Sequence, residues 1–159
     1  MSYHIYNTKG IILSERPLGE ADRIYSILTR DLGLVKARAL AVRKINSKLR
    51  GDLEPLTLAN VSLVRGNEYW RATSAEVIAR ISATDAILQP LALVEKLNQG
   101  EQIHPELFDA VERNLDSGEI TLVSQILHHL GYLKEADLNL DRKSLIQAIN
   151  KGLNSSHLV

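Results

Sequence analysis

The residues best suited to chemistry lie between Lys36 and Arg50, where six positive charges occur with no acidic residue among them. Two alternate with apolar residues along an expected strand, and four fall in the following segment, together with the polar Asn46 and Ser47. A flexible cationic segment suits a phosphate backbone, because each neutralised phosphate releases condensed counterions. The competing interpretation is a solvated loop kept basic for solubility. Because no acid restores local neutrality, we expect nucleic-acid binding at Lys36, Arg38, Arg43, Lys44, Lys48 and Arg50.

Aromatic side chains, the usual companions of single-strand binding, are scarce at 4% of the sequence. Trp70 and Arg71 are the best stacking candidates, because an indole and a guanidinium both suit the face of a base. Trp70 would equally suit a plug at one end of a barrel. The shortage of aromatic residues predicts binding that phosphate contacts dominate and that is largely indifferent to base sequence.

No residue pattern indicates catalysis. The sequence lacks the glycine-rich phosphate and dinucleotide motifs, the helical zinc-protease motif and the nucleophile elbow. It contains no cysteine, which excludes disulfides, thiolate metal sites and a cysteine nucleophile. His128 and His129 are adjacent on an expected helix and point about 100° apart, so they cannot chelate one metal. Glu20 and Asp22 suit hydrogen-bond acceptance in a turn. We therefore expect a protein that is not an enzyme and has no metal site or cofactor.

Composition and charge place the chain among ordinary globular proteins. Its 159 residues are 45% hydrophobic and 24% charged, with a mean hydropathy of −0.09. The net charge of zero divides into +5 for residues 1–80 and −5 for residues 81–159. This asymmetry indicates that one half meets a polyanion, unless it is a chance difference between two solvated surfaces. No apolar run approaches the length of a membrane span and no signal peptide is evident, so we expect a cytoplasmic protein without membrane contact.

Hydrophobic periodicity changes from that of strands to that of helices near residue 82. Before this point, short runs rich in β-branched and aromatic residues alternate with turn signals. Gly10 interrupts the first run, as expected for a bulge or bend in a strand that curls around a barrel. Five strands in about eighty residues suit a small barrel of the OB type. The expected strands are 3–13, 23–29, 34–42, 56–64 and 68–79.

After residue 82 the apolar residues recur at helical spacing. Pro90 lies inside the first expected helix and should kink or restart it. The fold class is therefore α+β, with an OB-type DNA-binding domain over residues 1–81 and a small helical partner-docking domain over 82–159. The expected helices cover 84–98, 104–115, 119–130 and 141–153.

Many short motifs in this order resemble the RecO family of bacterial recombination mediators. The resemblance begins with Gly10-Ile11-Ile12-Leu13, Gly19-Glu20-Ala21-Asp22-Arg23-Ile24 and Leu28 to Leu34. It continues through Arg43-Lys44, Ser47 to Gly51, Leu53 to Leu56 and Ala75-Glu76, then through Pro105 to Phe108 and Leu127 to Leu133. It covers residues 3–135. Many relatives continue into a larger helical part, often with a four-cysteine zinc module, so this chain resembles a short form without that module.

The resemblance implies an N-terminal OB domain, a helical domain and a role in DNA repair and recombination. Family members bind single- and double-stranded DNA, anneal complementary strands, engage the single-stranded DNA-binding protein SSB, including through its C-terminal tail, and help load RecA with RecR. The resemblance implies DNA contacts at the basic residues above, with Arg23 as a further candidate, and a place at the nucleoid. A protein-interaction adaptor with little DNA affinity is the alternative, in which the charge asymmetry serves assembly.

Overall fold

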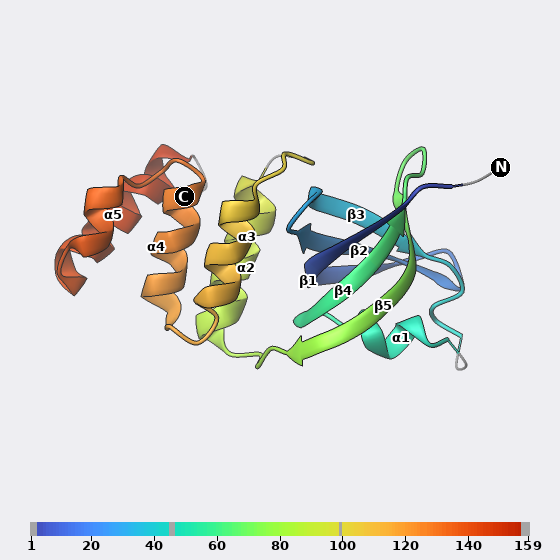
Figure 1. Ribbon diagram of the computed structural model, residues 1–159. Helices are drawn as coiled ribbons and strands as arrows, with labels where there is room; N and C mark the ends of the chain where they lie inside the picture. The colour runs from blue at the N-terminus through green and yellow to red at the C-terminus, as the bar shows by residue number, and fades with distance from the viewer. Residues whose placement is uncertain (1–2, 45–46, 99, 157–159) are drawn as a thin grey trace. The chain divides into compact units, whose positions relative to one another are not determined.

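The computed structural model describes residues 3–44, 47–98 and 100–156 and divides them between two compact units. Residues 1–82 and 100–105 form the first unit, and residues 83–99 and 106–159 form the second. The first contains the strands β1 (Ile5–Leu18), β2 (Asp22–Thr29), β3 (Gly33–Ala39), β4 (Thr57–Val64) and β5 (Trp70–Arg80), with the short helix α1 (Leu49–Asp52) between β3 and β4. Figure 1 shows these strands in blue to green. The expected α+β fold class is confirmed.

The five strands close into a barrel in the order β1-β2-β3-β5-β4, as in an OB-type fold. The long strand β1 joins two neighbours, because Ile5 to Ile11 pair with β4 and Gly10 to Leu18 pair with β2. A short parallel contact between β3 and β5 completes the ring, and there Arg38 lies opposite Arg71. The interior of the barrel is filled by apolar side chains that include Ile12, Tyr25, Ile27, Val35, Val61 and Trp70.

Gly10 does not form the bulge expected from the sequence. The register shift in β1 falls between Ile12 and Ser14, and β1 runs through Gly10 without interruption. A Cβ atom at position 10 would lie 2.6 Å from Cγ2 of Ile27, so the glycine permits close packing between β1 and β2.

The basic segment after β3 is more structured than the sequence indicates. The strand ends at Ala39 rather than at residue 42, because Ala41 adopts a left-handed conformation with φ of 54° and turns the chain. The segment then forms α1, where Leu49 packs against the barrel core and the following Leu53 is fully buried. A four-residue helix is too short to show helical periodicity, so the sequence did not predict it.

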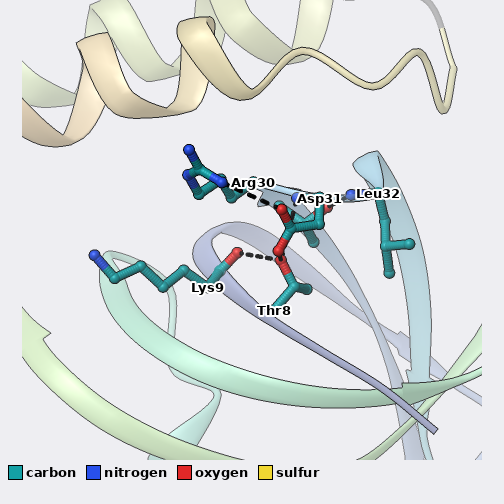
Figure 2. A network of polar contacts seen from close by, with 6 residues as sticks. Thr8, Lys9, Arg30, Asp31 and Leu32 are labelled. Carbon is teal, nitrogen blue, oxygen red and sulfur yellow. Dashed lines mark hydrogen bonds and ion pairs between the residues drawn. The ribbon is translucent and has the colours of Figure 1, made fainter.

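Polar contacts tie the turn between β2 and β3 to β1, as Figure 2 shows. The Thr8 hydroxyl donates to Oδ2 of Asp31 at 3.0 Å and accepts the Asp31 N–H at 3.2 Å. The Arg30 N–H donates to the Lys9 carbonyl at 3.0 Å. Thr8 is only 5% exposed, so these bonds satisfy polar groups that barrel closure removes from water.

The second unit contains α2 (Asp85–Leu97), α3 (Pro105–Arg113) from its second residue onward, α4 (Glu119–His129), the 3-10 helix η1 (Glu135–Asn139) and α5 (Arg142–Ser155). All four expected α-helices are present. Helix α2 continues through Pro90, which is buried on its packed face and costs one backbone hydrogen bond, so the expected restart does not occur. The short η1 was not expected. Among the described residues, no helix has the length and apolar character needed to cross a membrane.

Candidate nucleic-acid interface

Strand β3 presents two of the six basic residues on one face, as its alternation predicts. Lys36 and Arg38 are exposed, whereas Val35, Ala37 and Ala39 are fully buried. The Lys36 ammonium donates to the Ser26 hydroxyl of the neighbouring strand β2. Both cations therefore point out of the barrel, and the β3–β5 pairing brings the exposed Arg71 beside Arg38.

Asp22, at the start of β2, holds Arg38 and the chain that follows β3. Its Oδ2 accepts from Nε and Nη2 of Arg38 at 2.9 and 2.5 Å, and its Oδ1 accepts the Ala41 N–H at 2.6 Å. The Ala41 hydrogen bond is the largest cause of a lowered Asp22 pKa, followed by the Arg38 contact. Asp22 accepts hydrogen bonds from the backbone and from an arginine, as the sequence indicated.

Arg43 extends this link to the turn between β1 and β2. Its backbone N–H donates to the Ala21 carbonyl at 2.9 Å, and its Nη1 donates to the Gly19 carbonyl at 2.9 Å. Arg43 thus fixes the basic segment to the turn while keeping a positive charge at the surface.

A cleft opens between this turn and the hairpin that joins β4 to β5. OB folds bind oligonucleotides at the corresponding loops. The sequence did not single out the hairpin residue Tyr69, whose hydroxyl accepts from Nη2 of Arg16 at 3.0 Å. Arg16 and Tyr69 are distant in sequence, so only the fold reveals their pairing. The cleft is lined by Leu18, Gly19, Glu20, Ala21, Asp22, Arg38, Glu68 and Tyr69.

Four of the predicted DNA-binding cations keep their side chains free for a ligand. Within residues 3–44, 47–98 and 100–156, no side-chain hydrogen bond or ion pair reaches Lys44, Lys48, Arg50 or Arg71. All four are exposed. Lys44 lies close enough to Asp22 to help lower the pKa of that carboxyl group. Asn46, the other polar donor expected in this segment, lies outside the described residues, whereas Ser47 is partly buried.

Arg23 lies apart from the exposed face that Lys36 and Arg38 share, so its predicted DNA contact stays a prediction. Successive side chains of a strand point to opposite faces, and Arg23 shares the interior-facing side of β2 with the fully buried Tyr25. Its Nη1 forms an ion pair with Oε1 of Glu15 at 2.9 Å. Burial is the main cause that raises the pKa of the Tyr25 hydroxyl, and the charges of Arg23 and Arg50 partly oppose it.

Trp70 is a barrel residue rather than an open stacking platform. Only 4% of its surface is exposed, and it packs in the apolar core. The Arg65 guanidinium lies 4.6 Å from the centre of the Trp70 ring, and Tyr6 meets the indole edge-on at 5.3 Å between ring centres. Base stacking on Trp70 would require these neighbours to leave, so the structure favours the alternative of a residue that fills one end of the barrel.

One of the two adjacent histidines, His128, contacts the backbone of the following turn. Nδ1 of His128 lies 3.1 Å from the Leu133 carbonyl, which links α4 to the turn that follows it. The His128 and His129 rings stand 5.1 Å apart at 67°. In the described part of the chain, no group of three or more metal-ligating side chains comes together.

The lowered pKa of Asp22 predicts a specific acid sensitivity. Between the ordinary value of 3.8 and the lower folded-state value, the unfolded chain binds this proton more readily than the folded chain. The contribution of Asp22 to the free energy of unfolding is therefore complete above pH 3.8 and is lost as the pH falls through the folded-state pKa. Urea unfolding at several pH values should show a smaller acid-dependent loss for Asp22→Asn than for the wild type. Equal losses in both proteins would contradict the assignment.

Comparisons with known proteins show that this chain is similar in sequence to one family. The model of the family described as "Recombination protein O N terminal" matches residues 1–81. Proteins named DNA repair protein RecO are 33% identical over 77% of this chain in Dehalococcoides mccartyi and 31% identical over 82% in Gloeobacter violaceus. A third, from Heliobacterium modesticaldum, is 28% identical over 93%. These alignments cover 51%, 52% and 59% of the three relatives, so the chain spans about half of their length.

Proposed function

Because this chain belongs to the RecO family, we propose that it serves DNA repair and recombination by binding single- and double-stranded DNA on its barrel. The observation that carries the proposal is a set of exposed cations that have no carboxylate partner among the described residues: Lys44, Lys48, Arg50 and Arg71. Internal ion pairs neutralise Arg23 and Arg38, but these four side chains remain available to phosphates.

The proposed mechanism is electrostatic and breaks no covalent bond. Two complementary strands repel each other through their phosphates, and cations held on one protein surface reduce that repulsion so that bases can pair. The contacts of Arg43 with the Gly19 and Ala21 carbonyls support this role, because they fix the base of the cationic segment to the barrel. Contacts to phosphate carry no base information, so annealing should proceed with strands of any complementary sequence.

We extend the proposal to two protein partners of the family, SSB and RecR. We also propose that the chain assists the loading of RecA on SSB-coated DNA. In the helical unit, α2, α4 and α5 line a groove with apolar side chains that include Leu93, Ile120, Val123 and Ile149, and Lys96 is among its lining residues. An apolar groove with a cation suits the C-terminal tail of SSB. A tail peptide should bind the wild type and bind Lys96→Glu more weakly; equal affinities would reject the groove as the tail site.

A salt series tests DNA binding directly. Four phosphate contacts to single-stranded DNA would give a log–log slope of affinity against salt of about −3, at about −0.7 per contact. The measurement is fluorescence anisotropy of a labelled oligothymidine from low to moderate salt. A flat dependence, or no binding at low salt, would favour the alternative of a protein-interaction adaptor.

A further inference from the structure

The segment 100–105 connects α2 to α3 in the sequence but belongs to the compact unit of the barrel. It passes so close to Gly33 that a Cβ atom there would lie 2.6 Å from the Gln102 carbonyl oxygen and 2.9 Å from the Glu101 carbonyl carbon. Gly33 also has a φ of +78°, which glycine adopts readily. The start of β3 is thus shaped to receive this segment.

Glu101 fastens the segment to the barrel with both of its carboxylate oxygens. Oε1 accepts from the Trp70 indole N–H at 2.6 Å, and Oε2 accepts from Nη1 of Arg65 at 2.8 Å. The Arg65 guanidinium also packs against the Trp70 ring, 4.6 Å from its centre. We call these three residues, Arg65, Trp70 and Glu101, the clasp.

The donors of the clasp form a preorganised anion site that a carboxylate of the same chain occupies. A guanidinium and an indole N–H are donors without acceptor capacity, and arginine also suits the oxygens of a phosphate. The site is accessible, because 64% of the Arg65 side chain and 38% of the Glu101 side chain are exposed. Arg65 and Trp70 flank residues 66–69, two of which, Glu68 and Tyr69, line the cleft described above.

We propose that Glu101 is an internal competitor of DNA, and that a backbone phosphate displaces its carboxylate from Arg65 and Trp70. Displacement removes the two side-chain bonds that Glu101 makes to the barrel, so it loosens the connection between α2 and α3. DNA binding on the barrel thereby changes a segment that leads directly into the helical unit. This inference rests on the proposed DNA binding and adds a phosphate site and a release step to it.

The variant Glu101→Gln tests the competition. The amide still accepts a hydrogen bond from Trp70 but no longer forms an ion pair with Arg65. Affinity for a labelled oligothymidine should rise about two- to fivefold, the size of an exposed ion pair. The control Glu76→Gln removes the same charge from an exposed position on β5 and should leave affinity near that of the wild type. Adding Arg65→Gln to Glu101→Gln should abolish the gain.

The release step has two independent readouts. Trp70 is the only tryptophan in the sequence, so its fluorescence reports on the clasp without interference. Oligothymidine should shift Trp70 emission and raise amide hydrogen exchange in residues 100–105 of the wild type. Both changes should already be present in DNA-free Glu101→Ala, which removes both side-chain bonds to the barrel.

The outcomes separate this inference from the proposed function. If the wild type binds with the expected salt slope but Glu101→Gln binds no more tightly than Glu76→Gln, the competition is rejected and DNA binding stands. Unchanged exchange in residues 100–105 when DNA binds would reject the release step. If none of the proteins binds oligothymidine at low salt, the proposed DNA binding fails and the clasp proposal fails with it.

Discussion

Reversing the charges of Arg43, Lys44 and Lys48 to glutamate is expected to lower affinity for single-stranded DNA about a hundredfold or more at low salt. The same change should make the log–log salt slope shallower by about 1.4, at about 0.7 per contact, because Lys44 and Lys48 are two of the four proposed phosphate contacts. These side chains lie in the exposed segment after β3, and the carboxylate of Asp22 is already engaged with Arg38 and the Ala41 N–H. Annealing of complementary oligonucleotides should slow in parallel, since it depends on the same neutralisation.

The matched control reverses three lysines of the helical unit, Lys134, Lys143 and Lys151, which are also exposed. Both triple variants change the net charge equally, so a general charge effect would reduce binding to a similar extent in both. A loss confined to the Arg43, Lys44 and Lys48 variant would assign DNA contact to the segment. Equal losses would mean that net charge, rather than this surface, governs binding.

The sequence predicted the parts of this interface that local periodicity determines. Alternation along β3 correctly placed Lys36 and Arg38 on one exposed face, because residues two apart in a strand share a side. It could not predict which cations are neutralised. The partners of Arg38, Arg23 and Arg43 lie 8 to 24 residues away in the chain, and strand pairing alone decides that they meet.

The burial of Trp70 is a second feature that the sequence alone could not predict. Its residue type suits both base stacking and core packing, and nothing local distinguishes the two. The choice depends on Glu101, 31 residues later, which accepts the indole N–H and lies on a segment that returns to the barrel from the helices. Similarly, the position of Gly10 within an apolar run suggested a bulge or bend there, but the close approach of Ile27 is what requires a glycine.

Replacing Gly33 with alanine is expected to lower the free energy of unfolding of the barrel by about 2–4 kcal/mol. Two costs combine at this position. A left-handed conformation with φ of +78° is unfavourable for any residue with a Cβ atom, and the new methyl group would overlap the backbone of Glu101 and Gln102. Because backbone atoms cannot rotate away as a side chain can, either the start of β3 or the segment 100–105 must move. Urea unfolding followed by Trp70 fluorescence measures the loss within the barrel unit.

Gly19→Ala is the control that separates these two costs. Gly19 also has a positive φ, +64°, but a Cβ atom there would meet nothing within 4 Å. Both substitutions lower the conformational entropy of the unfolded chain by the same amount. This contribution to the free energy of unfolding therefore cancels when the two variants are compared. Gly19→Ala should therefore cost only the conformational part, about 1–2 kcal/mol, and the excess for Gly33→Ala measures contact with residues 101–102. If the two variants lose equal stability, the segment 100–105 does not pack against β3 in solution, and the clasp could not hold it there.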